Sequence, residues 1–395
     1  MRGPSAKNYL HCSLPPLYVA HSTDPCLQKK PFDSAPPANR AGVPPDRPEI
    51  QPENPPAGYT GYHEPILLEE ILELAGPVAP RWIVDGTLGD GGHSLAFLER
   101  FPEARVLGGD QDAVMLERAG SRIQAAGYAD RFEAIHTNFR HLPAQLDERG
   151  IRPDFMLLDL GVSMFHFRGA ARGFSYEDAQ SLDMRLDTHD PRRPTAADLI
   201  NTAGMAELQR IFQEYGEERF AGRIARAIVE SRPIHTAREL AALIRRSVPH
   251  PAPARADAGG KSGRKSSYKK DGGDGGRKTG GGQIHPATRV FQALRIAVND
   301  ELGAAQAALG LDGLPARLAP GGRLAVISFH SLEDRVVKAA FREIGVPAHQ
   351  RRAREAQYRI LTRKPLPPSP AEIARNPASR SAKLRVLERS AETIP

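Results

Sequence analysis

A glycine-rich segment directly follows an apolar run that predicts a β-strand. Residues 85–93 read DGTLGDGGH, and the segment after them predicts a helix. Glycines allow positive φ angles and close approach of the backbone to a ligand, and the first turn of a helix offers free N–H groups. Asp110 ends the next predicted strand, 19 residues after Gly91, which is the usual spacing of an acid that binds ribose hydroxyls. The loop and the acid together predict a site for a nucleotide-type cofactor.

The composition of this loop favours one cofactor over another. Ser94 stands where the dinucleotide-binding fingerprint has its third glycine. Asp85 ends the strand, where it would repel a pyrophosphate but could meet the ammonium group of an amino acid directly or through water. We therefore expect S-adenosylmethionine as methyl donor rather than NAD, and an NAD-type oxidoreductase is the first alternative.

A further acidic residue, Asp159, ends the fourth predicted strand in the segment Asp159–Ser163 (DLGVS). In open α/β sheets the chemistry takes place beyond the carboxyl ends of the strands. A carboxylate there could accept a hydrogen bond from the exocyclic amine of a base, whose lone pair is otherwise delocalised into the ring, and so assist an in-line methyl transfer. We expect Asp159 to be the catalytic residue, and the alternative is that it only caps the following turn or orders the loop.

Polar residues also gather after the fifth predicted strand, in the segment 328–335 (SFHSLEDR). His330 could hydrogen-bond a base or a phosphate, or could be structural. Ser331 and Glu333–Asp334 could equally cap a helix through Val336–Phe341. The chain has no G-x-S-x-G sequence of a serine hydrolase, and no paired His/Cys spacing predicts a catalytic metal.

The elements that must position these residues alternate between strands and helices. Near-continuous apolar strands separated by helices predict a parallel sheet covered on both faces. We expect the strands at 81–85, 104–110, 132–136, 154–160, 323–329 and 382–387. We expect the accompanying helices at 94–101, 113–126, 142–149, 287–302 and about 304–311. The fold class is therefore α/β, a Rossmann-like methyltransferase sheet interrupted by an inserted helical domain.

The domain division follows from changes in pattern along the chain. Residues 1–57 are rich in proline and have no hydrophobic period, so they predict a disordered tail. Residues 58–164 and 284–395 predict a discontinuous methyltransferase domain. Residues 165–283 predict a helical insertion, with the clearest helices at Glu207–Tyr215 and Glu217–Glu230, that ends in a disordered loop rich in Gly, Lys and Arg at about 249–283.

Composition limits the compartment and the partners. The formal net charge is +7 and the pI is about 9.5, which favours a polyanionic partner such as RNA. The two cysteines, Cys12 and Cys26, both lie in the proline-rich tail, so no disulfide framework is expected. No apolar run has the length of a membrane span, and the first residues lack the apolar core of a secretory signal. We expect a cytoplasmic protein without a membrane partner.

Several residues could handle RNA, each with an alternative. Arg219, Arg223 and Arg226 recur with the spacing of one helix face, which could contact RNA or be solvated and paired with Glu217 and Glu218. Arg172 and Phe174 could hold a base that has been flipped out of its stack, or Phe174 and Tyr176 could belong to the core. The basic Gly-rich loop could tether phosphates.

Taken together, these residues resemble the bacterial RsmH (MraW) family of small-subunit ribosomal RNA cytosine-N4 methyltransferases. The resemblance runs in order over about residues 62–390. The segments that carry it are 63–70 (HEPILLEE), 85–94 (DGTLGDGGHS), 157–163 (LLDLGVS), 172–176 (RGFSY), 182–185 (LDMR), 215–229 (YGEERFAGRIARAIV), 285–299 (HPATRVFQALRIAVN), 328–338 (SFHSLEDRVVK) and 376–386 (NPASRSAKLRV). It implies N4-methylation of cytosine 1402 in the decoding centre of 16S rRNA, within the small ribosomal subunit.

The resemblance also implies roles for particular cofactor-binding residues. Gly91, Gly92 and His93 would contact the methionine part of S-adenosylmethionine. Asp110 would bind the ribose and Phe139 would flank the adenine.

Two further positions complete the expected pocket. Asp159 would line it, and His166 stands where the family has a glutamine after its DLGVS segment. A histidine lacks the paired donor and acceptor of an amide, so this position departs from the family pattern. A small-subunit-binding assembly factor with weak catalysis is therefore a second alternative. The resemblance leaves the oligomeric state open, a homodimer included.

Overall fold

A single mixed sheet runs through the methyltransferase part of the computed structural model, which describes residues 61–62, 64–168, 170–179, 181–249, 287–350 and 356–391. The predicted tail 1–57 lies outside the described residues, as does the glycine-rich loop 249–283 apart from Pro249. All described elements belong to one compact unit of the chain, Glu53–Pro395. None of the described helices combines the length and the apolar character that crossing a membrane requires.

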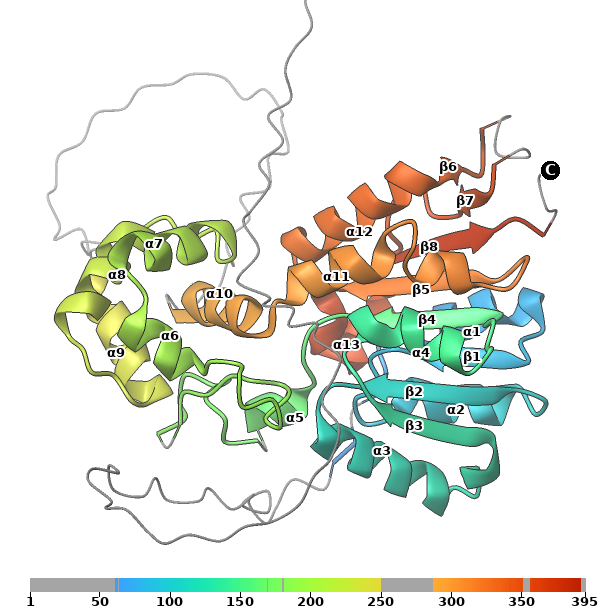
Figure 1. Ribbon diagram of the computed structural model, residues 1–395, viewed down its shortest axis with the longest axis horizontal. Coiled ribbons are helices and arrows are strands. Elements are labelled where there is room, and N and C mark those ends of the chain that lie inside the picture. The colour runs from blue at the N-terminus through green and yellow to red at the C-terminus, as the bar shows by residue number, and fades with distance from the viewer. Residues whose placement is uncertain are drawn as a thin grey trace, which may run out of the picture. The chain divides into compact units, whose positions relative to one another are not determined.

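The sheet has eight strands in the order β3-β2-β1-β4-β5-β8-β7-β6 (Figure 1). The strands are β1 (Trp82–Asp85), β2 (Arg105–Asp110), β3 (Phe132–His136), β4 (Phe155–Asp159), β5 (Arg323–Ser328), β6 (Val346–Pro347), β7 (Tyr358–Ile360) and β8 (Lys383–Arg389). The strands β1 to β5 pair in parallel, and β8 joins β5 in antiparallel register. The order reverses between β1 and β4, and ligands of doubly wound sheets bind beyond the carboxyl ends of the strands at such a point.

Helices cover both faces of this sheet, as the near-continuous apolar strands predict. They are α1 (Leu68–Ala75), α2 (Gly92–Arg100), α3 (Ala113–Ala125), α4 (Leu142–Glu148), α11 (Glu301–Leu309), α12 (Ser331–Ile344) and α13 (Pro370–Arg375). Side chains alternate between the faces along each strand: Ile83 packs in one cluster with α1 and α2, and Val84 in another with α4, α11 and α12. This double burial fixes the register of the central strands and so the positions of the loops that follow them.

A group of helices has a hydrophobic core of its own. Its members are α6 (Ala196–Thr202), α7 (Met205–Glu214), α8 (Ala221–Glu230), α9 (Ala237–Ser247) and α10 (Ala287–Asn299), and a short helix α5 (Met164–Arg168) precedes them. Figure 1 shows α6 to α9 gathered beside α10. Within the described part of 165–248 no strand occurs, as the sequence predicts.

Several boundaries differ from the prediction: α2 begins at Gly92 rather than Ser94, and α8 begins at Ala221 rather than Glu217. The helix expected at 287–302 ends at Asn299, because Asp300 adopts a left-handed conformation (φ 49°) and α11 begins at Glu301. The last strand extends to Arg389, and the strands β6 and β7 were not predicted at all. They are two and three residues long, too short to show a period in the sequence.

Candidate functional site

A cavity of about 440 Å³ lies at the carboxyl ends of β1, β2, β4 and β5, within the size range of ligand pockets. Residues of α5 and α10 also line it. Of the seven predicted cofactor-binding residues, six line this cavity: Gly92, His93, Asp110, Phe139, Asp159 and His166. The structure therefore brings together residues that are up to 74 positions apart in the sequence.

Gly91, the seventh, does not line the cavity. It is the N-cap of α2 with φ 72°, and a Cβ at this position would lie 2.9 Å from the Cβ of Ala119 on α3. Only glycine adopts this conformation without strain and lets the loop pack so closely on α3. Gly91 therefore shapes the loop from behind, while Gly89 and Gly92 face the cavity.

Asp85 is also placed differently from our expectation. Its carboxylate is 1% exposed, does not line the cavity, and accepts hydrogen bonds from the Thr87 N–H (3.3 Å) and the Ser94 hydroxyl (2.8 Å). Burial raises the pKa of Asp85 to about 6, against the two hydrogen bonds that lower it. Asp85 therefore organises the loop from behind the cavity, which disfavours a direct contact with an amino acid's ammonium and leaves the expected contact through water as a prediction.

Asp110 joins two segments of the cavity wall. Its oxygens accept hydrogen bonds from the backbone N–H of Gly89 (2.8 Å) and of Asp112 (2.9 Å). Burial raises the pKa of Asp110 to about 6. Because each carboxylate oxygen has a second lone pair, the group can still accept a hydrogen bond from a hydroxyl in the cavity.

His93 is 7% exposed and lies where α2 meets the segment before α1. Its Nε2 is 3.0 Å from the carbonyl oxygen of Ile66, and burial lowers the pKa of His93 to about 4. The ring is therefore neutral at pH 7, with Nε2–H donating to Ile66. That leaves Nδ1 as an acceptor, suited to an N–H donor in the cavity.

Asp159 combines burial with an unused oxygen. Its backbone N–H donates to Thr87 Oγ1 (2.6 Å), whereas Oδ1 is buried and has no hydrogen-bond partner among the described residues. Burial raises the pKa of Asp159 well above its ordinary value, and the carboxylates of Asp85 and Glu333 add to the effect. The alternative that Asp159 merely caps the next turn has no support in these contacts, and its carboxylate resembles a group held for a ligand.

The polar residues after β5 cap the helix α12 and line the cavity. His330 is the N-cap of α12, its Nδ1 accepting from the Glu333 N–H (3.3 Å), while Glu333 accepts from the Phe329 N–H (2.7 Å). His330 rather than Ser331 is thus the cap. His330 also lines the cavity, and its Nε2 lies 3.0 Å from Glu333 Oε1, so both ring nitrogens contact Glu333.

A largely buried ion pair between Arg295 and Glu301, whose side chains are 13% and 11% exposed, forms another part of the wall that our sequence reasoning missed. The guanidinium of Arg295 bonds both oxygens of Glu301 (2.9 and 3.0 Å). Glu301, His330 and Glu333 are close enough to hold a cation, but Arg295 already neutralises Glu301. The signal in the sequence was the pair of polar residues Arg295 and Asn299, four apart in the otherwise apolar second half of α10 (residues 293–299).

His166 connects this cavity to the helical part of the chain. Its Nε2 is 2.9 Å from Asp112 Oδ2, and the guanidinium of Arg172 bonds the same oxygen. His166 is 5% exposed, and its Nδ1 is buried without a partner in the described structure. Its ring packs against Phe174, with centroids 5.2 Å apart.

Two expectations about RNA-handling residues change accordingly. Arg172 and Phe174 do not line the cavity: Arg172 also donates to the carbonyls of Arg185 and Leu186, and Phe174 is buried in the helical core. The core alternative for Phe174 is therefore the right one.

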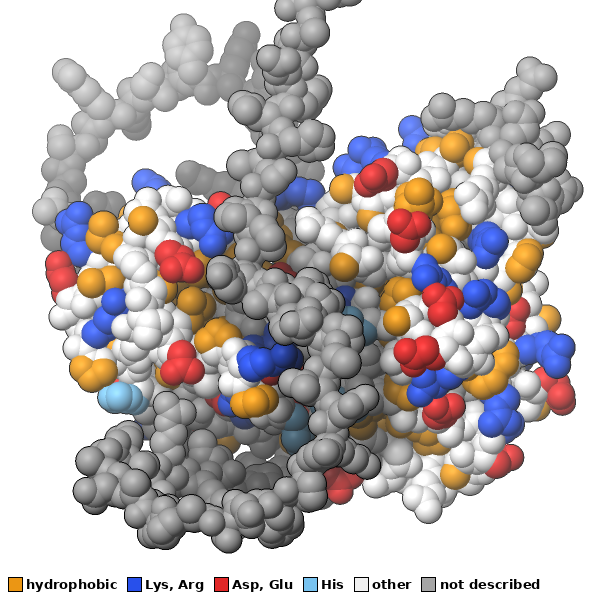
Figure 2. Space-filling view, viewed as in Figure 1, with side chains coloured by type: hydrophobic (Ala, Val, Ile, Leu, Met, Phe, Trp, Pro, Cys, Tyr) orange, Lys and Arg blue, Asp and Glu red, His pale blue; other side chains and the backbone are white. Residues whose placement is uncertain are grey.

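The predicted arginine stripe is incomplete. Arg219 precedes α8, so that Arg223 and Arg226 alone share its exposed face. Glu217, one of the acids expected beside them, instead bonds Ser331 and Arg335. Figure 2 shows Lys and Arg side chains interspersed with Asp and Glu over the visible face, so charge on that face does not identify an RNA surface.

Comparison with known proteins identifies the family. The sequence model of the MraW methylase family matches residues 60–390. A protein of Synechococcus sp. (strain JA-2-3B'a(2-13)), named ribosomal RNA small subunit methyltransferase H, is 43% identical over 87% of this chain and 97% of its own length. A protein of the same name from Thermobifida fusca (strain YX) is 42% identical over 84% of this chain and 94% of its own length.

Solved structures are much less similar. An rRNA methylase from Streptococcus thermophilus is 10% identical, with 84% of this chain and 99% of that chain covered and a TM-score of 0.33, and a likeness at that level carries no argument. The identification therefore depends on sequence and on the cavity described above. The chain belongs to the MraW methylase family, and is a methyltransferase rather than the NAD-type oxidoreductase that we held as an alternative.

Proposed function

We propose that this protein transfers a methyl group from S-adenosylmethionine to N4 of cytosine 1402 of 16S rRNA, within the small ribosomal subunit in the cytoplasm. The observation that carries the proposal is the Asp159 carboxylate, which lies in one cavity with the glycine loop and Asp110 and has an oxygen without a partner in the described structure. The names of the curated relatives, ribosomal RNA small subunit methyltransferase H, support the class of substrate.

The cavity residues fit S-adenosylmethionine chemically. Gly92 leaves the backbone accessible at the start of α2, and the neutral His93 offers an acceptor for the ammonium of the methionine part. Asp110 can accept from the ribose hydroxyls, and Phe139, half-buried in a short 3-10 helix, offers a ring for the adenine. The buried Nδ1 of His166, which lacks a partner in the described structure, can bond a polar atom of the same ligand.

The donor, when bound, supplies an electrophilic methyl group on a sulfonium. The chain must then direct the lone pair of the N4 amine toward that methyl and receive the proton that the amine loses. Because its pKa is raised, the Asp159 carboxylate is a stronger base than an exposed aspartate, so it can accept a hydrogen bond from the amine and take the proton as the N–C bond forms. His330 lines the same cavity, but its Nε2 already pairs with Glu333 Oε1 (3.0 Å), which favours the structural alternative for this histidine.

The test is methyl transfer from labelled S-adenosylmethionine to small subunits from cells that lack the gene, followed by mass spectrometry that maps the modified nucleotide. We expect one methyl group, on N4 of the proposed cytosine. Asp159→Asn, which keeps the backbone bond to Thr87, should slow transfer at least about a hundredfold while cofactor binding persists. Asp130→Asn, at an exposed position outside the cavity, is the matched control.

Three results would count against the proposal. A mark at another nucleotide would change the substrate, and an Asp159→Asn enzyme as fast as the control would remove the role of the carboxylate. A folded wild-type protein that binds subunits but transfers no methyl would favour the assembly-factor alternative that His166 left open.

We also propose that the helical insertion forms a domain of its own between the two parts of the methyltransferase domain. The separate core of α6 to α9 supports this division. The helix α10, which we had assigned to residues 284–395, packs in that helical core, so we place the second boundary at about Asn299.

A further inference from the structure

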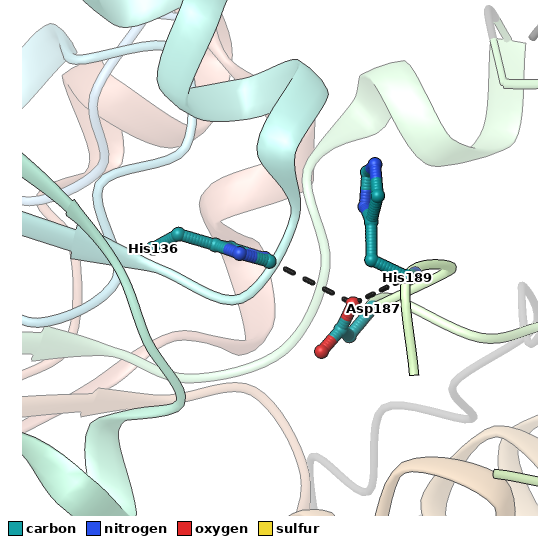
Figure 3. A group of neighbouring side chains, drawn as sticks. All are labelled: His136, Asp187 and His189. Atoms are coloured by element: carbon teal, nitrogen blue, oxygen red, sulfur yellow. Dashed lines mark hydrogen bonds and ion pairs between the residues drawn. The ribbon is translucent and has the colours of Figure 1, made fainter. Parts of the chain in front are cut away.

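Three side chains that sequence reasoning did not single out meet beside the cavity (Figure 3). His136 is the last residue of β3, and Asp187 and His189 lie 51 and 53 residues further along the chain. One ligand atom from each lies within 4.8 Å of the others. We propose that these residues form a binding site for a divalent transition-metal ion of the zinc class.

The donor set suits such an ion. Imidazole nitrogens with one carboxylate oxygen are ligands of Zn²⁺ and its neighbours, and three protein ligands leave one tetrahedral position for water. Ligand atoms about 2.0–2.2 Å from a tetrahedral ion lie roughly 3.3–3.5 Å apart. The separation of His136 Nε2 and Asp187 Oδ1 is 3.9 Å, and these side chains are 40% and 27% exposed, so small rotations close the remaining gap.

The three side chains converge without bonding one another through their polar ends. At 3.9 Å the His136 and Asp187 atoms are too far apart for a hydrogen bond, and the rings of His136 and His189 meet edge to face with centroids 5.8 Å apart. His136 Nε2 instead contacts the Gln111 carbonyl oxygen at 2.8 Å. A metal ion on Nε2 would take the place of this hydrogen bond: the Nε2 proton would leave to solvent, and Nδ1 would carry the ring's proton instead.

Hydrogen bonds of the backbone fix the two segments that carry His136, Asp187 and His189. His136 pairs with Asp110 in the sheet, so it lies at the same strand ends as the cavity. The His189 N–H donates to Asp187 Oδ1 (2.9 Å), which fixes the two ligands in one turn. The preceding residue, Leu186, is anchored through its N–H by Asn299 Oδ1 (2.9 Å).

The position of the site gives the ion a role. Gln111 and Leu186 both line the cavity and lie next to the proposed site. Gln111 contacts His136 through its carbonyl oxygen, and Leu186 directly precedes Asp187 in the sequence. A bound ion would join the end of β3 to the segment of the helical insertion that precedes α6. It would hold this side of the cavity together without contacting the reacting atoms.

The test uses the full chain, freed of metal by chelation and titrated with Co²⁺, whose visible spectrum reports tetrahedral coordination, and with Zn²⁺ in competition. We expect the wild type to bind one ion more than His189→Ala or His136→Ala. Asp187→Asn, which keeps the acceptor for the His189 N–H, should weaken binding at least about tenfold. His235→Ala, at an exposed histidine outside the cluster, should bind as the wild type does.

Each variant keeps both cysteines and all the other histidines, so metal binding at those residues contributes equally to the wild type and to the variant compared with it. Unfolding temperatures measured without metal must agree, which separates loss of a ligand from loss of the fold. Equal stoichiometry and affinity in the wild type and in His189→Ala would overturn the proposal, as would no Co²⁺ binding by the wild type. The readout needs neither methyl donor nor RNA, so its outcome is independent of the proposed methyl transfer.

Discussion

The buried carboxylate of Asp112 joins α3 to His166 and Arg172, and we expect its loss to lower the free energy of unfolding strongly. Its Oδ2 bonds both His166 and Arg172, and its Oδ1 caps α3 by accepting from the Val114 N–H (3.0 Å). The side chains of Asp112 and Arg172 are 3% and 14% exposed. Asp112→Asn keeps the cap but leaves Arg172 without its counter-charge, and breaking a buried pair on one side costs about 3–5 kcal/mol. We expect the lower end, because Arg172 keeps its bonds to two carbonyls.

The assay is urea-induced unfolding of the two proteins at pH 7. Glu214→Gln is the control, because it removes an exposed pair with Arg210 on one helix, and should cost at most about 0.5 kcal/mol. Burial alone would raise the pKa of Asp112, but the His166 hydrogen bond and the charge of Arg172 outweigh it and lower that pKa. The carboxylate's contribution is thus complete above its ordinary pKa, near 3.9, and is lost as the pH falls through the lower folded value. An Asp112→Asn protein within about 1 kcal/mol of the wild type at pH 7 would refute the reasoning.

Three further predictions concern the cavity wall. Gly91→Ala should lower the free energy of unfolding by about 2 kcal/mol in urea titrations, because it forces an alanine to positive φ, whereas Gly120→Ala, with open space around its Cβ in a helix, should cost nothing. Since the pKa of Asp85 rises from 3.8 to about 6 on folding, the wild type loses stability as the pH rises from about 4 to 6, and Asp85→Asn should remove about 3 kcal/mol of that loss in unfolding measured across this range. Glu301→Gln should destabilise the fold by about 3 kcal/mol in urea, since Arg295 is left buried without a carboxylate, and an unchanged midpoint would contradict this.

The sheet could be predicted because its signals are local. The apolar run of β4 and the acid that ends it, Asp159, are adjacent in the sequence, and the same holds for β2 and Asp110. Parallel strands buried on both faces bring such acids to one edge without further information. The pocket followed from this rule together with the glycine loop.

The orientation of individual site residues could not be predicted, because it depends on contacts between segments that are distant in the sequence. Gly91 and Asp85 belong to the predicted loop, but whether a residue faces the cavity or the protein interior depends on α3 packing behind it, which no local pattern records. The site of His136, Asp187 and His189 joins two segments that no spacing rule connects. The wall residue Arg295 lies on a helix that packs mainly in the helical core.

The histidine at position 166, where the resemblance implies a glutamine, connects the cavity to the fold. A glutamine at this place could donate and accept from one amide, whereas the imidazole divides its two nitrogens between two neighbours: Nε2 bonds Asp112, and Nδ1 remains buried at the cavity. Asp112 in turn follows Asp110 by two residues and bonds it through the backbone N–H (2.9 Å). Loss of the Asp112 carboxylate should therefore move His166 and weaken cofactor binding as well as the fold. A change in stability without a change in S-adenosylmethionine affinity would mean that His166 is held by its packing on Phe174 alone.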